Sequence, residues 1–263
     1  MTNMGSMGEP EEPLEGGSVN MVVRVGGTVR RPSGIWTPTV HALLRHLESA
    51  GFAESPRVLG IDDQGRDVLT FIPGETVKSP WPEVMLRDDG ILQLAKLLRR
   101  FHDAVRSFTP PPDARWRNPL AQRTGELVRH GDFAPFNSVW KEGEVIGLLD
   151  WDFAQPGSAI TDLAYLAWYA VPLLSDERAK DYGVTEPVDR ARRLRLLCDA
   201  YGGNGPREVI AEAVRLIDLE RTQTEELADR GVDPWTRFAA DGNPTAFMSE
   251  ARWIRRNGAR LLG

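Results

Sequence analysis

The stretch RHGDFAPFNSVWKEGEVIGLLDWDFA, residues 129–154, restricts the fold more than any other part of the sequence. Two apolar runs, Ser138–Trp140 and Val145–Leu149, are separated by Lys-Glu-Gly-Glu, which is typical of a tight turn. A β-hairpin is therefore predicted here. Five polar residues flank its open end: His130, Asp132, Asn137, Asp150 and Asp152. Three carboxylates, an amide and an imidazole gathered at one end of a short hairpin indicate a chemical site.

These side chains suit three tasks: metal binding, proton acceptance and positioning of a loop. Pairing of the two strands places Asn137 beside Asp150, and an amide oxygen next to a carboxylate suits Mg²⁺, which takes few protein ligands and leaves room for phosphates. Asp132 lies in the preceding loop, where a carboxylate can accept a proton from a hydroxyl and orient it for attack on phosphorus. His130 can hold the loop backbone. Taken singly, each residue could serve a cap or a turn, so only the complete set points to phosphoryl transfer.

The spacing of the set matches that of protein kinases, which use H-x-D-x-x-x-x-N followed by a metal-binding Asp after a short hairpin. With HGDFAPFN at 130–137, GLLDWDFA at 147–154 and DLAY at 162–165, the sequence resembles the aminoglycoside phosphotransferase and choline kinase-like family. In that family Gly replaces the Arg of the protein-kinase loop. The resemblance implies an α+β, bilobal, protein-kinase-like fold, with a small β-rich lobe and a larger helical lobe that carries the hairpin. It also implies ATP or GTP with Mg²⁺ and phosphorylation of a small-molecule hydroxyl.

The resemblance also assigns roles by position. Asp132 corresponds to the catalytic base, with His130 in the same loop, and Asn137 and Asp150 correspond to the metal ligands. Asp152 stands at the family's second acidic position and is expected to reach the metal through water. A further acid, in the DLAY segment, corresponds to the one that braces the catalytic loop, through the loop histidine or through backbone amides.

The rest of the chain divides at its prolines and glycines. Residues 1–13 are acidic and lack an apolar run, so a disordered leader without a signal peptide is expected. Residues 14–72 predict a β-rich, nucleotide-binding lobe, 73–82 a Pro/Gly-rich connector, and 83–263 a catalytic and acceptor-binding lobe. Strands are expected at 21–25 and 28–31, and helices near 37–51, 83–108, 161–174, 189–201, 206–229 and 245–262.

The segment VLTFIPGE, residues 68–75, resembles the connection between the lobes whose backbone binds the adenine edge. Leu69 would take the gatekeeper position, and Thr70, Phe71 and Ile72 would offer backbone groups to the nucleotide. An edge strand with a Pro-Gly exit is the alternative. EGGSVN, residues 15–20, resembles the loop that covers the phosphates, although two adjacent glycines are a weak feature on their own.

The small lobe departs from the family pattern at the phosphate-binding residue. The family places a Lys on the third strand and a Glu on the following helix. Here the strand reads TVRRP; strand alternation directs one of Arg30 and Arg31 to the cleft, and we favour Arg30. His41 stands near the position of the missing Glu, and a neutral His forms no ion pair. The departure supports an alternative function, a catalytically weak or inactive binding or immunity module, and the small lobe resembles trifolitoxin-immunity-like sequences.

The acceptor is the least defined partner. Residues 219–250 hold seven acidic residues against three arginines, with Trp235 and Phe238 among them. Such a surface would suit a cationic acceptor such as an aminoglycoside or a quaternary amine, although a run of charge is more often a solvated helix face. Trp168 and Tyr169 are expected in the core.

Composition narrows the partners and the location. With 32 basic and 38 acidic residues the net charge is −6, which argues against a nucleic-acid surface. The longest apolar stretch, Leu163–Leu174, is too short to span a bilayer, so no membrane partner is expected. A single cysteine, Cys198, allows no internal disulfide and suits a reducing cytoplasm; we expect it in the core. The sequence leaves the oligomeric state open.

Overall fold

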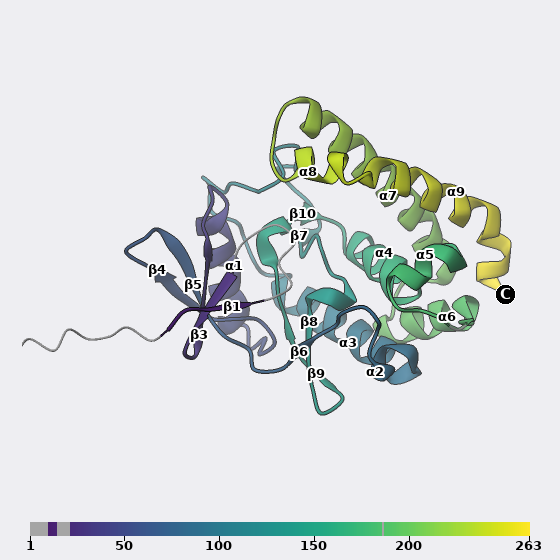
Figure 1. Ribbon diagram of the computed structural model, residues 1–263, viewed down its shortest axis with the longest axis horizontal. Coiled ribbons are helices and arrows are strands. Elements are labelled where there is room, and N and C mark those ends of the chain that lie inside the picture. The colour runs from purple at the N-terminus through teal and green to yellow at the C-terminus, as the bar shows by residue number, and fades with distance from the viewer. Residues whose placement is uncertain (1–9, 15–21, 186) are drawn as a thin grey trace, which may run out of the picture.

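The small lobe is built on one antiparallel sheet (Figure 1). The computed structural model describes residues 10–14, 22–185 and 187–263. Among them the strand order is β1-β2-β3-β5-β4. The strands are β1 (Glu12–Leu14), β2 (Val22–Val25), β3 (Thr28–Pro32), β4 (Val58–Ile61) and β5 (Arg66–Thr70). Gly26 adopts a φ of 57°, as the two-residue turn between β2 and β3 requires.

Strand β1 begins inside the segment expected to be a disordered leader, residues 1–13. Glu12, Pro13 and Leu14 pair with β2, so the leader prediction is wrong for Glu12 and Pro13, while Leu14 belongs to the predicted small lobe. Glu and Pro have low strand propensity, and the order of β1 comes from backbone pairing with its neighbour. Residues 1–9 of the leader and the EGGSVN segment, residues 15–20, lie outside the described residues.

Helix α1 (Thr37–Ser49) links the sheet to the large lobe. It contacts β4 as well as α3 (Asp88–Val105). Its apolar residues recur at helical spacing and are buried: Val40, Leu43, Leu44 and Leu47. This stripe predicted the helix from the sequence, because a helix face turned to a core repeats every three to four residues.

The predicted hairpin is present between the lobes, as β8 (Ser138–Lys141) and β9 (Glu144–Leu148). Positive φ angles at Glu142 and Gly143 close the turn. A third strand, β6 (Glu75–Thr76), comes from the connector and pairs with β8. The sequence did not predict β6, because two residues are too few to show a strand pattern. Through β6 the connector is attached to the hairpin that carries the candidate site.

Helices make up most of the large lobe, and the long helices α7 and α9 run along its outer edge (Figure 1). The predicted helix 83–108 is two helices, because Arg87 is extended, with φ −86° and ψ 167°. The prediction of 206–229 is confirmed in full. The helices are α2 (Glu83–Leu86), α3, α4 (Ala159–Ala170), α5 (Asp176–Asp181), α6 (Arg190–Tyr201), α7 (Pro206–Asp229), α8 (Trp235–Ala240) and α9 (Asn243–Leu262). The short helices α5 and α8 were missed, since each spans fewer than two turns.

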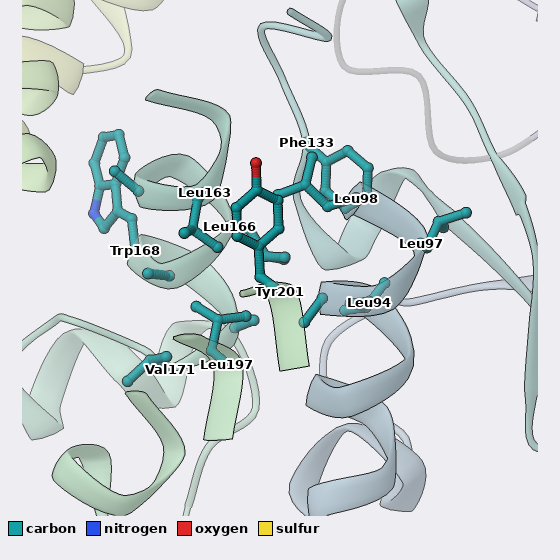
Figure 2. Packing of buried hydrophobic residues seen from close by; sticks show 14 of the residues in the cluster. Leu94, Leu97, Leu98, Phe133, Leu163, Leu166, Trp168, Val171, Leu197 and Tyr201 are labelled. Carbon is teal, nitrogen blue, oxygen red and sulfur yellow. The ribbon is translucent and has the colours of Figure 1, made fainter. Parts of the chain in front are cut away.

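The core of the large lobe lies between α3, α4 and α6 (Figure 2). Leu94, Leu98 and Leu166 are fully buried there, and Trp168 is 1% exposed. The core position expected for Trp168 is therefore confirmed, as is that of Cys198, which is also buried. This packing supports α4, the helix that carries the DLAY segment, residues 162–165.

Candidate active site

The predicted catalytic loop begins where β7 (Leu127–Arg129) ends, and β10 (Gln155–Gly157) pairs beside β7. Gly131 in this loop has a φ of 84°. A Cβ at this position would lie 2.0 Å from the carbonyl oxygen of Phe153. Only glycine allows this close approach. The loop therefore packs directly on the Asp-Trp-Asp-Phe segment that follows the hairpin.

Asp162 on α4 holds the loop from behind. Its Oδ2 accepts a hydrogen bond from the His130 amide at 2.7 Å, and its Oδ1 accepts one from the Gly131 amide at 3.0 Å. His102 Nε2 donates to Oδ2 at 3.3 Å. Burial alone would raise the pKa of Asp162, but the bond from His102 and nearby positive charge hold it below its usual value. Asp162 thus braces the loop through backbone amides, one of the two predicted routes.

His130 ties the two ends of the hairpin together. Its Nε2 donates to the Leu149 carbonyl at 3.0 Å, and its Nδ1 accepts from the Asp132 amide at 3.2 Å. The ring is fully buried. Burial lowers the pKa of His130 to about 4, so the ring is neutral at physiological pH. The structure gives His130 a positioning role beside the predicted base, with both ring nitrogens bonded to the backbone.

Asp132, the predicted base, is held by two donors. Asn137 Nδ2 donates to its Oδ2 at 2.8 Å, and the Tyr165 hydroxyl donates to its Oδ1 at 2.7 Å. Burial, helped by the negative charge of Asp150, raises the pKa of Asp132 to about 7, despite the two hydrogen bonds that lower it. A carboxyl group that titrates near neutral pH suits proton transfer.

The predicted metal ligands Asn137 and Asp150 lie on either side of the hairpin base. The Leu149 amide donates to the Asn137 carbonyl at 2.8 Å, which holds the two segments together. Asp150 is in the left-handed region, with φ 57°, and its side chain is 40% exposed. The partial burial of Asp150 and the neighbouring charge of Asp152 raise the pKa of Asp150, so a cation beside it would be stabilising.

These residues fit one Mg²⁺ whose coordination a nucleotide completes. Asn137 uses Nδ2 to bind Asp132, which leaves its amide oxygen for a metal. Within the described residues, no group of three or more His, Cys, Asp or Glu side chains is arranged to hold a metal. A site made of one amide oxygen and one carboxylate depends on phosphate oxygens for its remaining ligands, as Mg²⁺ sites in kinases do.

The structure places Asp152 differently from the prediction. Both of its carboxylate oxygens bind arginines: Oδ1 accepts from Arg31 and Oδ2 accepts from Arg117 at 2.5 Å. Its side chain is fully buried. Asp152 is therefore an anchor for two guanidinium groups, and the expected contact with a metal through water is not supported. Because Asp152 follows Asp150 by two residues, the sequence made both acids look like metal ligands. Only the side chain of Asp150 is exposed to solvent.

The expectation that Arg30 faces the cleft is wrong. Arg30 donates to the Thr28 hydroxyl and lies 3.7 Å from Asp62, a residue of the small lobe. Arg31 is the residue that points to the carboxylates of the large lobe. Strand alternation correctly separated the two arginines, but the sequence could not fix which of them faced inward.

Some backbone amides of the predicted hinge, residues 69–72, already donate hydrogen bonds to other residues of the small lobe. Leu69 is buried in the core, which suits a gatekeeper. The Thr70 amide donates to Arg57 O and the Phe71 amide donates to Gly27 O, both at 2.9 Å. Ile72 contacts the hairpin at Gly147. The predicted nucleotide contact therefore depends on Ile72 and the connector beyond it, rather than on the amides of Thr70 and Phe71.

A cavity of about 220 Å³ opens beside Asp132. Its acidic lining residues are Asp132, Glu220 and Glu250, and Arg178 is the basic one. Its aromatic lining residues are Phe136, Phe153, Tyr165, Tyr169, Tyr182, Trp235, Phe238 and Phe247. Tyr169, expected in the core, thus lies at this cavity instead. It follows Trp168 on α4, and the two rings stack with their centroids 4.8 Å apart.

Some acidic residues of the segment 219–250 line the cavity, as predicted for an acceptor-binding surface, and others lie on a solvated helix face, the predicted alternative. Glu220 and Glu250 reach the cavity together with Trp235 and Phe238. Glu225 and Glu226 are exposed and pair with arginines one turn away on α7, as on a solvated helix face. Burial raises the pKa of both Glu220 and Glu250. A small acidic, aromatic-lined cavity therefore forms from a few members of the run.

Comparison with known proteins agrees with this geometry. Residues 113–196, a span that contains the catalytic loop, the hairpin and Asp162, match the sequence model of the phosphotransferase enzyme family. Over 195 residues the chain is 42% identical to the trifolitoxin immunity protein of Rhizobium leguminosarum bv. trifolii, covering 72% of this chain and 73% of that protein. The chain belongs to the phosphotransferase enzyme family. The resemblance stated from the sequence, including its immunity-protein branch, is confirmed.

Solved structures support the fold of this phosphotransferase-family protein. A choline/ethanolamine kinase family protein from Mesorhizobium loti is 20% identical, with a TM-score of 0.61 over 96% of this chain and 92% of that chain. The GDP complex of aminoglycoside 2'-phosphotransferase-IIIa is 14% identical, with a TM-score of 0.61 over 95% of this chain and 94% of that chain. The predicted α+β, bilobal, kinase-like fold is therefore confirmed. Among the described residues, no helix is both long and apolar enough to cross a membrane.

Three residues of the site were missed from the sequence. Tyr165 follows Asp162 by three positions on α4, and this helical spacing could have placed both on the side facing the loop. Asp67 could be paired with Arg31 only once the register of β3 and β5 was known. Arg117 lies in a loop and has no sequence pattern that predicts its contact with Asp152.

Proposed function

We propose that this phosphotransferase-family protein is a nucleotide- and Mg²⁺-dependent O-phosphotransferase that acts on a small-molecule hydroxyl. One observation carries the proposal: Asp132, with its pKa near neutral, lines the acceptor cavity while its loop also holds Asn137 beside Asp150. A base in contact with an acceptor cavity and a pair of hard-oxygen ligands behind it is the arrangement that in-line phosphoryl transfer needs.

In this mechanism an acceptor hydroxyl enters the cavity and binds the carboxylate of Asp132, which orients it and takes its proton as its oxygen bonds to the γ-phosphorus. The bond from that phosphorus to the bridging oxygen breaks, and nucleoside diphosphate leaves. The Tyr165 and Asn137 donors keep the carboxylate aligned. Asn137 and Asp150 would hold Mg²⁺, which when bound neutralises charge on the transferred phosphate. ATP or GTP would lie between the lobes against the hinge, with Leu69 at its base and Ile72 as its nearest backbone contact.

The cavity favours an acceptor that carries a positive charge and some apolar surface. Glu220 faces it from α7, and Trp235 and Phe238 cover it from α8. Aromatic faces and carboxylates together bind amines through cation–π and ionic contacts. Aminoglycosides and other hydroxylated, aminated antibiotics have these features. A nucleoside triphosphate as co-substrate, like the single cysteine, would place the protein in the cytoplasm.

A binding or immunity module without turnover is the second candidate. The 42% identical relative is a trifolitoxin immunity protein, and Lys is absent from the third strand. The two functions differ in one measurement. A binding module would be stabilised by its small-molecule ligand without releasing nucleoside diphosphate, whereas the phosphotransferase releases it only when the acceptor is present.

The test has two steps. Melting temperature is measured with ATP or GTP, with and without Mg²⁺; we expect stabilisation by nucleotide that increases with Mg²⁺. A panel of aminoglycosides, choline-like amines, sugars and hydroxylated antibiotics is then screened for acceptor-dependent release of nucleoside diphosphate. Absence of Mg²⁺-dependent stabilisation at millimolar nucleotide would exclude the metal assignment. Stabilisation by one of the acceptors with no turnover would favour the binding module.

A further inference from the structure

A chain of charged groups with little solvent exposure joins the two lobes beside the predicted phosphate site. Arg31 Nε donates to Asp67 Oδ2 at 2.9 Å, and Asp67 Oδ1 lies 2.7 Å from His41 Nε2. Asp67 is fully buried and His41 is 6% exposed. Arg31 Nη2 donates to Asp152, and Nη1 lies 3.8 Å from Asp150. One guanidinium group therefore contacts carboxylates from both lobes.

We propose that Arg31 binds the phosphates of the nucleotide and that Asp67 and His41 are its positioning residues, so that the acid of the usual Lys–Glu pair has moved from helix α1 to strand β5. The proposal rests on the phosphotransferase function proposed above. It adds two residues, Asp67 and His41, to that site. His41 occupies α1, where the family pattern has its Glu, and holds the relocated acid instead of the cation.

The sheet fixes this arrangement. Arg31 of β3 and Asp67 of β5 are directly opposite each other in the antiparallel ladder. Residues opposite each other in such a ladder have Cβ atoms about 5 Å apart and share a face of the sheet. Because both ends of the pair are on neighbouring strands, a displacement of α1 cannot separate them. A Lys–Glu pair between a strand and a helix lacks this property.

Asp67 stays ionised in its buried position. Burial alone would raise its pKa, but the hydrogen bond from His41 and the charge of Arg31 hold the pKa below its usual value. His41 occupies the oxygen that Arg31 does not use. With both oxygens bonded, the carboxylate cannot rotate, and Arg31 is held in one orientation.

Arginine can serve this role where lysine could not. Its planar group offers donors on three nitrogens: Nε for Asp67, Nη2 for Asp152, and Nη1 on the side of Asp150. A lysine ammonium also has three donors, but all of them are on one nitrogen atom and cannot span groups as far apart as those that the guanidinium fork reaches. Nη1 faces the predicted metal ligand, where the phosphates of a bound nucleotide would lie.

The experiment measures binding of ATP·Mg, GTP·Mg and the free nucleosides to the full chain by calorimetry. Four substitutions are compared: Arg31→Gln, Asp67→Asn, His41→Leu and, as a matched control for loss of one acidic charge, Asp63→Asn at an exposed position before β5. We expect Arg31→Gln to weaken triphosphate binding by roughly 10²-fold and Asp67→Asn by roughly 10-fold, because each loses a charge-assisted contact. Nucleoside binding should change by less than about twofold, which also shows that the variants are folded.

Two further variants separate positioning from simple loss of stability. His41→Gln keeps a donor for Asp67 and should restore most of the triphosphate affinity lost in His41→Leu. Asp67→Asn combined with His41→Glu returns an acid to α1 and should recover part of the loss of Asp67→Asn. A larger triphosphate-specific loss in Arg30→Gln than in Arg31→Gln would overturn the proposal. So would an Asp67→Asn protein with wild-type triphosphate affinity.

The outcomes also distinguish this proposal from the proposed function. A wild-type protein that binds neither nucleotide nor nucleoside would remove the phosphotransferase function and the role of Arg31 with it. A wild-type protein that binds Mg-nucleotide and transfers phosphate, with Asp67→Asn and His41→Leu unchanged in triphosphate affinity, would remove the positioning role alone.

Discussion

The two sides of the candidate nucleotide site follow the family pattern to different degrees. On the large-lobe side, the predicted catalytic loop keeps Asp132 and Asn137 at kinase spacing, and Asp162 of α4 braces the loop through its backbone amides. On the small-lobe side, Arg31 and Asp67 replace the usual pair, and their contacts run between strands and between lobes. The large-lobe side is thus a preserved side, which keeps the family residues, and the small-lobe side is a rebuilt side, which has other residues in their place.

The difference shows where the chemistry of the site can tolerate change. The base must lie within hydrogen-bonding distance of one hydroxyl, and the loop that carries it is closely packed: a Cβ at Gly131 would meet the Phe153 carbonyl at 2.0 Å. The phosphate-binding cation needs only to deliver positive charge to a spread of oxygens. Arginine and an acid from another strand can meet that need, whereas the loop has no comparable alternative.

The largest expected effect tests the preserved side. Asp132→Asn keeps the shape of the side chain but removes the proton acceptor and its charge, so kcat should fall by roughly 10²-fold or more once an acceptor is known. Nucleotide affinity should change little, in contrast to the variants of Arg31. The exposed Asp63→Asn substitution is the matched control. An Asp132→Asn protein with wild-type kcat would show that the preserved spacing is not evidence of chemistry.

Asp162→Asn should have the next largest effect, on stability. The amide would place an NH₂ group against the His130 or Gly131 amide and leave a buried donor without an acceptor. We expect the free energy of unfolding to fall by about 3 kcal/mol, as for other buried networks that lose a charged partner. Urea denaturation measures it. A loss below 1 kcal/mol would mean that the loop does not depend on this brace.

Much of the preserved side could be predicted from the sequence. The sequence predicted that Asp132, Asn137 and Asp150 lie together at one end of the hairpin, because their contacts follow chain spacing across one loop and one hairpin. Helix α7 was predicted to the residue, because Pro206 marks its start and its apolar residues keep a helical period. Contacts between residues that are close in the sequence can be predicted from the spacing of those residues.

The rebuilt side could not be predicted in the same way. Whether Arg30 or Arg31 faces inward depends on strand register, and a shift of one residue reverses the two faces. Asp152 looked like a second metal ligand, and only the positions of Arg31 and Arg117, from distant segments, show that it is an arginine anchor. Strand β1 likewise exists through its pairing with β2 and not through its own composition.

Acidification should lower the free energy of unfolding through His130, which lies on the preserved side. Its pKa is about 4 in the folded protein and 6.5 in the unfolded chain, so the unfolded chain binds the proton more readily. The stability that the neutral ring contributes is complete above pH 6.5 and is lost as the pH falls toward 4. The difference corresponds to about 3 kcal/mol. His130→Gln should be less stable than wild type at pH 7, and the gap should narrow as the pH approaches 4. Parallel pH profiles of the two proteins would contradict a buried neutral imidazole.

Tyr165→Phe should give the smallest effect and the most specific one. The lost hydroxyl donates to Asp132 and lowers its pKa, so its removal should raise that pKa above about 7. Because the base must be ionised, kcat at pH 7 should fall by less than about fivefold and recover toward the wild-type value near pH 9. Bound Mg²⁺ would lower the midpoint of the kcat–pH profile in both proteins without removing the difference between them.

The pH profile of kcat thus distinguishes two substitutions that affect the same carboxyl group. The loss of kcat in Asp132→Asn should persist at every pH, while the loss of kcat in Tyr165→Phe should disappear at alkaline pH. A Tyr165→Phe deficit that is independent of pH would show that the hydroxyl positions the acceptor and does not tune the base.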